Sequence, residues 1–90
     1  MLKTISITVK GKVQGVFYRQ STKETANRLG ITGEVKNLSN GDVHIIATGS
    51  EEQLQSLTTW CKRGPERAVV TDVIIENISL QSFDKFKVIR

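Results

Sequence analysis

Alternating apolar and polar residues predict three strands with one buried face along the first fifty residues of the chain. They cover residues 5–10, 31–36 and 42–48. The turn between the last two, residues 38–41, contains an Asn-Gly pair, which favours a hairpin. We expect a further strong strand over residues 69–78, and a short apolar stretch adds a small edge strand over residues 86–89.

Two helices are predicted between these strands. The first begins near residue 19 or 21, where Ser21 and Glu24 have the spacing of a capping box, and Gly30 lies just past its end. The second follows a similar pair, Ser50 and Gln53, and ends at a Lys-Arg-Gly-Pro sequence. Its apolar face is formed by Leu54, Leu57, Trp60 and Cys61.

The resulting order is strand, helix, strand, strand, helix, strand, with the short edge strand added at the end. This order predicts the α+β class and, within it, a ferredoxin-like α/β sandwich of βαββαβ type. Both helices would cover one face of a mostly antiparallel sheet of four to five strands. Because no repeat, low-complexity tract or linker interrupts the pattern, we expect one domain over residues 1–90.

Composition narrows the functional classes. The chain is 38% hydrophobic and 24% charged, as in ordinary globular proteins. Its single Cys61 cannot form an internal disulfide, no Cys or His cluster has metal-ligand spacing, and no segment resembles a signal peptide or a membrane span. We therefore expect a cytoplasmic protein without a metal or other cofactor. The net charge of +4 favours an anionic partner, and because the basic residues are scattered, a small anion is favoured over nucleic acid.

The segment between the first strand and the first helix has features of a phosphate site. A glycine-bearing loop that leads into a helix can direct successive backbone N–H groups toward an anion, and the helix dipole adds positive charge there. Arg19 supplies a planar pair of donors that matches two phosphate oxygens. The spacing matches neither common nucleotide-binding glycine motif. On spacing alone, a plain connecting loop and a surface ion pair for Arg19 remain equally good interpretations.

Two sequence motifs support the interpretation of this segment as a phosphate site. Residues 11–19 read GKVQGVFYR, and residues 33–49 read GEVKNLSNGDVHIIATG. They resemble the two signatures of the acylphosphatase family, in the family's order and at its separation. The resemblance covers essentially the whole chain, and it implies a metal-free hydrolase of carboxyl-phosphate anhydrides. Its substrate would be an acyl phosphate and one of its products inorganic phosphate, and we expect a monomer.

The resemblance also implies site residues. Arg19 would bind the phosphoryl group, and Asn37 would hold the attacking water. The amide of Asn37 is neutral, so it adds no negative charge beside the phosphate. The backbone donors would come from a loop formed by Gln14, Gly15, Val16, Phe17 and Tyr18. Without the resemblance, Asn37 would be interpreted as a residue that starts a turn. Glu34 departs from the family pattern, because an aromatic residue usually follows the glycine there, and by alternation it lies on the sheet face opposite the helices.

Other interpretations are weaker. The alternative function is a non-catalytic acyl or carbamoyl phosphate-binding module of the same fold. RNA recognition would need aromatic residues on the central strands, whose outward positions hold none. His44 is expected to be an exposed strand residue and Cys61 a buried packing residue. Glu51 and Glu52 complement the dipole of the second helix and are not expected to be catalytic.

Overall fold

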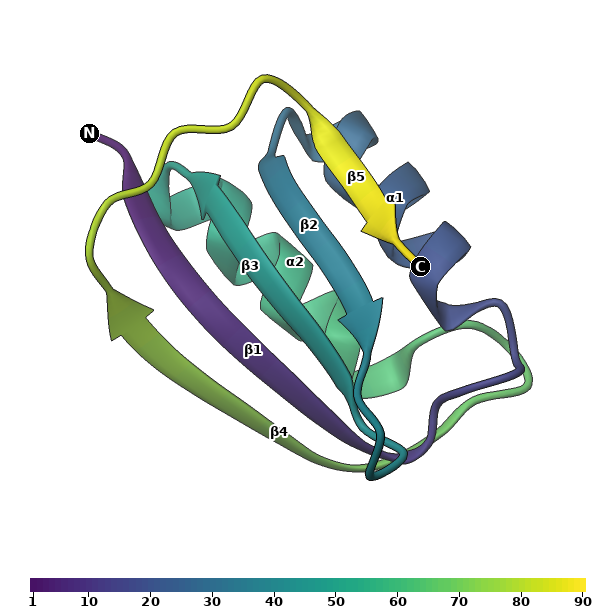
Figure 1. The fold of residues 1–90 in the computed structure, drawn as a ribbon. Coiled ribbons are helices and arrows are strands. Elements are labelled where there is room, and N and C mark those ends of the chain that lie inside the picture. Colours follow the sequence, from purple (N-terminus) through teal and green to yellow (C-terminus); the bar gives the residue numbers. More distant parts are fainter.

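The computed structural model describes residues 1–90 and confirms the predicted order of elements. These are β1 (Lys3–Lys12), α1 (Tyr18–Leu29), β2 (Thr32–Asn37), β3 (Val43–Gly49), α2 (Glu51–Arg63), β4 (Val69–Ile78) and β5 (Phe86–Ile89). Figure 1 shows both helices behind one face of a five-stranded sheet, whose order is β4-β1-β3-β2-β5. Only the pair of β2 with β5 is parallel, so the mostly antiparallel ferredoxin-like sandwich is confirmed.

The core lies between the sheet and the two helices. Ile5, Ile7 and Val9 of β1 are buried there, which confirms the face predicted from their alternation. From α2, Leu54, Leu57 and Cys61 join the same cluster of 16 buried residues, against which Trp60 packs at the margin. A single cluster of this kind means that the helices are held mainly by their apolar faces. Neither helix is long and apolar enough to cross a membrane.

The predicted capping box at Ser21 and Glu24 was wrong. Helix α1 begins at Tyr18, one residue before the earlier of the two predicted starts, and its N-cap is Phe17, whose side chain makes no capping hydrogen bond. Ser21 cannot serve as the cap because its amide already donates the first intrahelical hydrogen bond, to the Phe17 carbonyl at 3.0 Å. The second capping box is confirmed, because Ser50 and Gln53 each accept from the other's backbone amide, at 3.2 and 2.8 Å.

The hairpin between β2 and β3 is confirmed, with a turn one residue longer than a two-residue Asn-Gly turn. The Gly41 amide donates to the Leu38 carbonyl at 3.2 Å, and the Leu38 amide donates to the Asp42 carbonyl at 2.8 Å. Ser39 and Asn40 therefore occupy the centre of the turn, and Gly41 follows them as a bulge. This arrangement leaves Asn37 as the last residue of β2, directly before the turn.

Residues 79–85 form a strap across the open face of the sheet, near the start of β1 and the end of β3, and lead the chain from β4 at one edge to β5 at the other (Figure 1). The strap is fastened at Gln81, whose amide donates to the Thr4 hydroxyl at 2.9 Å. The Thr48 hydroxyl donates to the Gln81 carbonyl at 2.8 Å. Thr4 and Thr48 are therefore buried, although alternation predicts that their face of the sheet is exposed. The strap connects directly to β5, which pairs with β2.

Candidate active site

One pocket, with a volume of about 450 Å³, brings together residues that are far apart in the sequence. Its lining residues are Val13, Gly15, Phe17, Tyr18, Arg19, Gln20, Asn37, Val88 and Arg90. Arg19 and Asn37, the two predicted catalytic residues, therefore share one pocket with part of the predicted loop. Gln14 and Val16 of that loop do not line it, since Val16 is buried in the core and the Gln14 side chain is bonded elsewhere.

The loop before α1 has backbone donors that no protein group uses. Gly15 and Phe17 both have left-handed backbone angles, with φ of 74° and 63°, and Phe17 is the only residue other than glycine with a positive φ. None of the backbone amides of residues 14–17 donates a hydrogen bond within the protein. Tyr18, as the first helical residue, has no acceptor within the helix. Free amides that turn into a helix N-terminus are suited to binding an anion.

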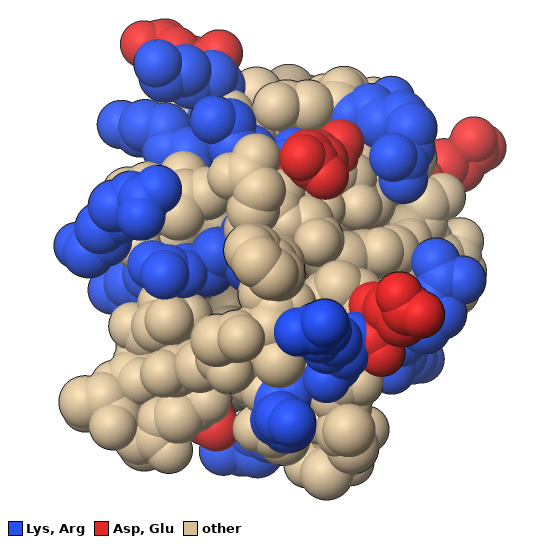
Figure 2. All heavy atoms as spheres, turned by 90° about the vertical axis from the view of Figure 1, so that its right-hand side faces the viewer, with Lys and Arg blue, Asp and Glu red and all other residues tan.

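Arg19 brings a charge to this pocket that no carboxylate neutralises. One guanidinium nitrogen, Nη1, donates to the Ile89 carbonyl of β5 at 3.3 Å, and Arg19 takes part in no ion pair. Arg90 also lines the pocket, whereas no Asp or Glu does. Figure 2 shows the side of the molecule that carries α1 and the C-terminus, where Lys and Arg side chains lie along one margin and at several other places, with acidic side chains among them. The electrostatic environment therefore favours a small anion.

Asn37 has an unusual environment for a turn-start asparagine. Its Oδ1 is the one buried side-chain polar atom in the structure to which no protein group donates. Leaving a buried acceptor without a donor costs about 1–3 kcal/mol, so such an atom calls for an explanation. Asn37 is also one of the residues that line the pocket, so its amide group lies beside the space that a water or ligand would occupy.

The comparison with known proteins identifies the family. A protein-family model described as Acylphosphatase matches residues 5–88. The chain belongs to the acylphosphatase family. It is 49% identical to an acylphosphatase of Marinobacter nauticus, over 90% of this chain and 89% of that protein. The structure of an acylphosphatase from Coxiella burnetii has a TM-score of 0.94 at 44% identity and covers 97% of this chain and 92% of that chain. The crystal structure of acylphosphatase from Bacillus subtilis has a TM-score of 0.94 at 35% identity and covers both chains fully.

The other reactive side chains of this acylphosphatase-family chain lie outside the pocket or are held inactive. Cys61 is fully buried, as predicted, and burial raises the pKa of its thiol to about 12. Tyr18 lines the pocket, but its hydroxyl donates to the Cys61 carbonyl at 2.7 Å. Burial raises the pKa of this hydroxyl well above its usual value. Partial burial, together with the charge of Lys36, lowers the pKa of His44, which does not line the pocket. No Asp, Glu, His or Lys side chain lines the pocket.

Two features of the site could not be found from sequence patterns. The Gln14 side chain crosses to the β2–β3 turn, and the carbonyl of Ile89 in β5 holds Arg19. No local signal marks either contact, because each depends on how distant strands are ordered in the sheet.

Glu34 lies on the open face between the buried Gly33 and Val35, as its alternation predicts, and it is outside the pocket.

Proposed function

We propose that this chain hydrolyses acyl phosphates to a carboxylate and inorganic phosphate, with Arg19 and the amides of residues 14–18 binding the phosphoryl group. Asn37 orients the attacking water. The observation that carries the proposal is that Asn37, whose buried Oδ1 has no donor, and the unneutralised Arg19 line the same pocket. Membership of the acylphosphatase family supports the same reaction class.

The proposed reaction needs positioning and charge more than acid or base catalysis. Water attacks phosphorus in line, the bond from phosphorus to the carboxyl oxygen breaks, and the carboxylate leaves without a proton because its pKa is low. Asn37 Oδ1 accepts one water hydrogen and directs the oxygen lone pair to phosphorus. Since no base lines the pocket, a phosphoryl oxygen takes the water's proton, so acyl phosphate and water become carboxylate and dihydrogen phosphate.

We propose further that the reaction is independent of metal ions. Arg19 and the loop amides supply the positive charge that a metal would supply in other phosphoryl-transfer sites. No side chain in the pocket lining offers a carboxylate, imidazole or thiolate as a ligand. The same proposal describes a cytoplasmic monomer that acts on a small anion and does not bind nucleic acid, which the scattered Lys and Arg residues and the single free Cys61 support.

The test measures hydrolysis of benzoyl phosphate by the wild type, by Arg19→Ala and by Asn37→Ala, with and without a chelator. One transition-state donor is worth about 3–4 kcal/mol, so each variant should lose at least about a hundredfold in kcat/KM. Arg19→Ala should also weaken inhibition by inorganic phosphate, whereas Asn37→Ala should lower kcat and leave that inhibition unchanged. Matched controls are Asn27→Ala and Arg28→Ala on the exposed side of α1, outside the pocket, which should retain wild-type rates.

Each part of the proposal can fail separately. A folded wild type that binds phosphate without turnover would indicate the non-catalytic phosphate-binding module instead. Loss of activity in the chelator would refute metal independence. Wild-type turnover by Asn37→Ala would remove the water-orienting role while leaving the enzyme assignment in place.

A further inference from the structure

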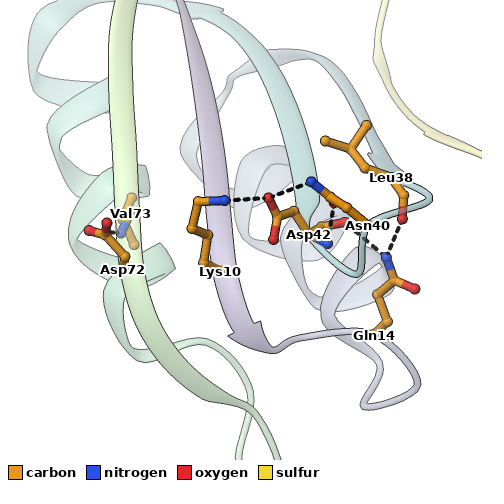
Figure 3. Close-up of polar contacts among 7 residues, drawn as sticks. All are labelled: Lys10, Gln14, Leu38, Asn40, Asp42, Asp72 and Val73. Atoms are coloured by element: carbon orange, nitrogen blue, oxygen red, sulfur yellow. Dashed lines mark hydrogen bonds and ion pairs between the residues drawn. The ribbon is translucent and has the colours of Figure 1, made fainter.

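The side chain of Gln14 joins the phosphate loop to the turn between β2 and β3 (Figure 3). Its Nε2 donates to the Leu38 carbonyl at 2.8 Å and to the Asp42 carbonyl at 2.9 Å. The two acceptors belong to Leu38 and Asp42, the pair whose backbone hydrogen bond closes the turn. Both hydrogens of the amide nitrogen are used, so the contact requires an NH₂ group, and a carboxylate at this position would place oxygen against oxygen.

The acceptors of Gln14 are themselves held in place. The Asp42 carbonyl also accepts from the Leu38 amide at 2.8 Å, which closes the turn. The Asp42 carboxylate accepts from Lys10 of β1 at 2.8 Å and from the Asn40 side chain at 3.2 Å (Figure 3). The turn is therefore a fixed support, tied to β1, against which the loop can be positioned.

The loop has no other polar contact with this support. The backbone amides of residues 14–17 donate no hydrogen bond within the protein, and both polar contacts between the loop and the turn come from the Gln14 side chain. Asn37 directly precedes Leu38, one of the two acceptors. The Gln14 side chain thus spans from the first residue of the phosphate loop to the residue next to Asn37.

We propose that Gln14 is a positioning residue that sets the phosphate loop at its working distance from Asn37. This inference rests on the proposed function, in which the loop carries the phosphoryl group and Asn37 carries the water. An in-line attack depends on the separation of those two groups, and a displacement of about 1 Å can cost about a hundredfold in rate. Phosphate binding itself depends on Arg19 and the loop amides, which stay together when the Gln14 contact is lost.

The test replaces the amide with an apolar side chain of similar length, in Gln14→Met. With benzoyl phosphate as the substrate, kcat should fall about tenfold or more, while the inhibition constant of inorganic phosphate stays within about twofold of the wild type. In an Asn37→Ala background, measured at raised enzyme concentration, the same substitution should change kcat by less than about twofold, because Gln14 acts through Asn37. Lys3→Met is the matched control, since it removes an exposed polar contact to Glu51, away from both the loop and the turn, and it should retain the wild-type kcat.

The outcomes separate this inference from the proposed function. An equal fold loss from Gln14→Met in the wild-type and Asn37→Ala backgrounds would overturn the positioning role, as would weakened phosphate inhibition with an unchanged kcat. Full activity of Asn37→Ala alone would instead overturn the proposed function.

A second variant keeps the test valid if Gln14→Met does not fold. Gln14→Glu offers no donor when ionised and regains one O–H donor when protonated. Its kcat relative to the wild type should therefore rise as the pH falls through about 5, near the carboxyl pKa. A ratio that stays constant with pH would contradict the requirement for a donor.

Discussion

Tyr18→Phe tests a contact that joins the start of α1 to the end of α2. The Tyr18 hydroxyl donates to the Cys61 carbonyl at 2.7 Å, and the side chain is only 1% exposed. Within α2 this carbonyl would accept from the residue four positions on, which is Pro65 and has no N–H. The nearby Gly64 amide is already bonded to Trp60. The tyrosine hydroxyl therefore satisfies a carbonyl that the helix itself leaves without a donor.

The expected magnitude follows from that geometry. The substitution leaves a buried acceptor without a donor, which costs about 1–3 kcal/mol. The ring is retained, so its packing against Trp60, with ring centroids 5.3 Å apart, does not enter this cost. Gly64 also lies close to the ring, since a Cβ there would be 2.7 Å from it, and the phenylalanine ring keeps this contact. We expect the free energy of unfolding to fall by about 2 kcal/mol, and the melting temperature by roughly 10 °C.

The assay is urea unfolding followed by circular dichroism, with the fluorescence of the single Trp60 as a second probe of two-state behaviour. Thr59→Ala is the matched control, because it removes an exposed hydroxyl that donates to the Gln55 carbonyl of the same helix at 2.9 Å. Water can replace that donor, so the change should stay within about 0.5 kcal/mol. If Tyr18→Phe costs no more than this control, the Cys61 carbonyl does not depend on the tyrosine and the reasoning is wrong.

Two further predictions concern pH and backbone strain. Burial raises the pKa of Cys61 from near 9 to about 12, so above pH 9 the unfolded chain loses a proton that the folded chain keeps. Cys61 should therefore leave the free energy of unfolding unchanged below pH 9 and lower it between pH 9 and 12, by up to about 1.4 kcal/mol per pH unit. In urea unfolding, the midpoint should accordingly fall less steeply with rising pH in Cys61→Ala than in the wild type. Phe17 has a left-handed backbone and a side chain that is 75% exposed, so Phe17→Asn should raise the free energy of unfolding by about 0.5–1 kcal/mol. Phe17→Ala should bring no such gain, and a gain equal to that of Phe17→Asn would show that backbone preference is not the cause.

Sequence patterns predicted the strands well because alternation is a local property that the sheet then uses directly. The bounds of β4 and β5 agree with the predicted residues 69–78 and 86–89. The cap of α1 was not predicted, because Phe17, in a conformation that its residue type does not favour, precedes the helix without a side-chain capping bond. The strap over the open face was not predicted either, since Gln81 and the two threonines that bind it are more than 30 residues apart in the chain.

The candidate site was predicted unevenly for the same reason. Resemblance to a family identifies residue types at positions, and it indicated Arg19 and Asn37, which the structure brings into one pocket. It does not indicate what holds those residues in place. For Gln14 it implies a role of the backbone only, and it indicates nothing about the carbonyl of Ile89, which is 70 residues from Arg19. Both contacts arise from the order of strands in the sheet, which places β2 between β3 and β5.

Three residues of one short segment each bind a different element, and this separates their effects on stability and on rate. Gln14 bonds the β2–β3 turn, Tyr18 bonds α2, and Arg19 bonds β5. The carbonyl that Tyr18 serves is in a buried contact, so no water can replace the lost donor and the cost falls on stability. The carbonyls that Gln14 serves are in part-buried contacts, where water can take over the hydrogen bonds but cannot hold the loop at a fixed distance. Tyr18→Phe should therefore lower the free energy of unfolding more than Gln14→Met does, whereas Gln14→Met should lower kcat more than Tyr18→Phe does, and the reverse order would contradict this division of roles.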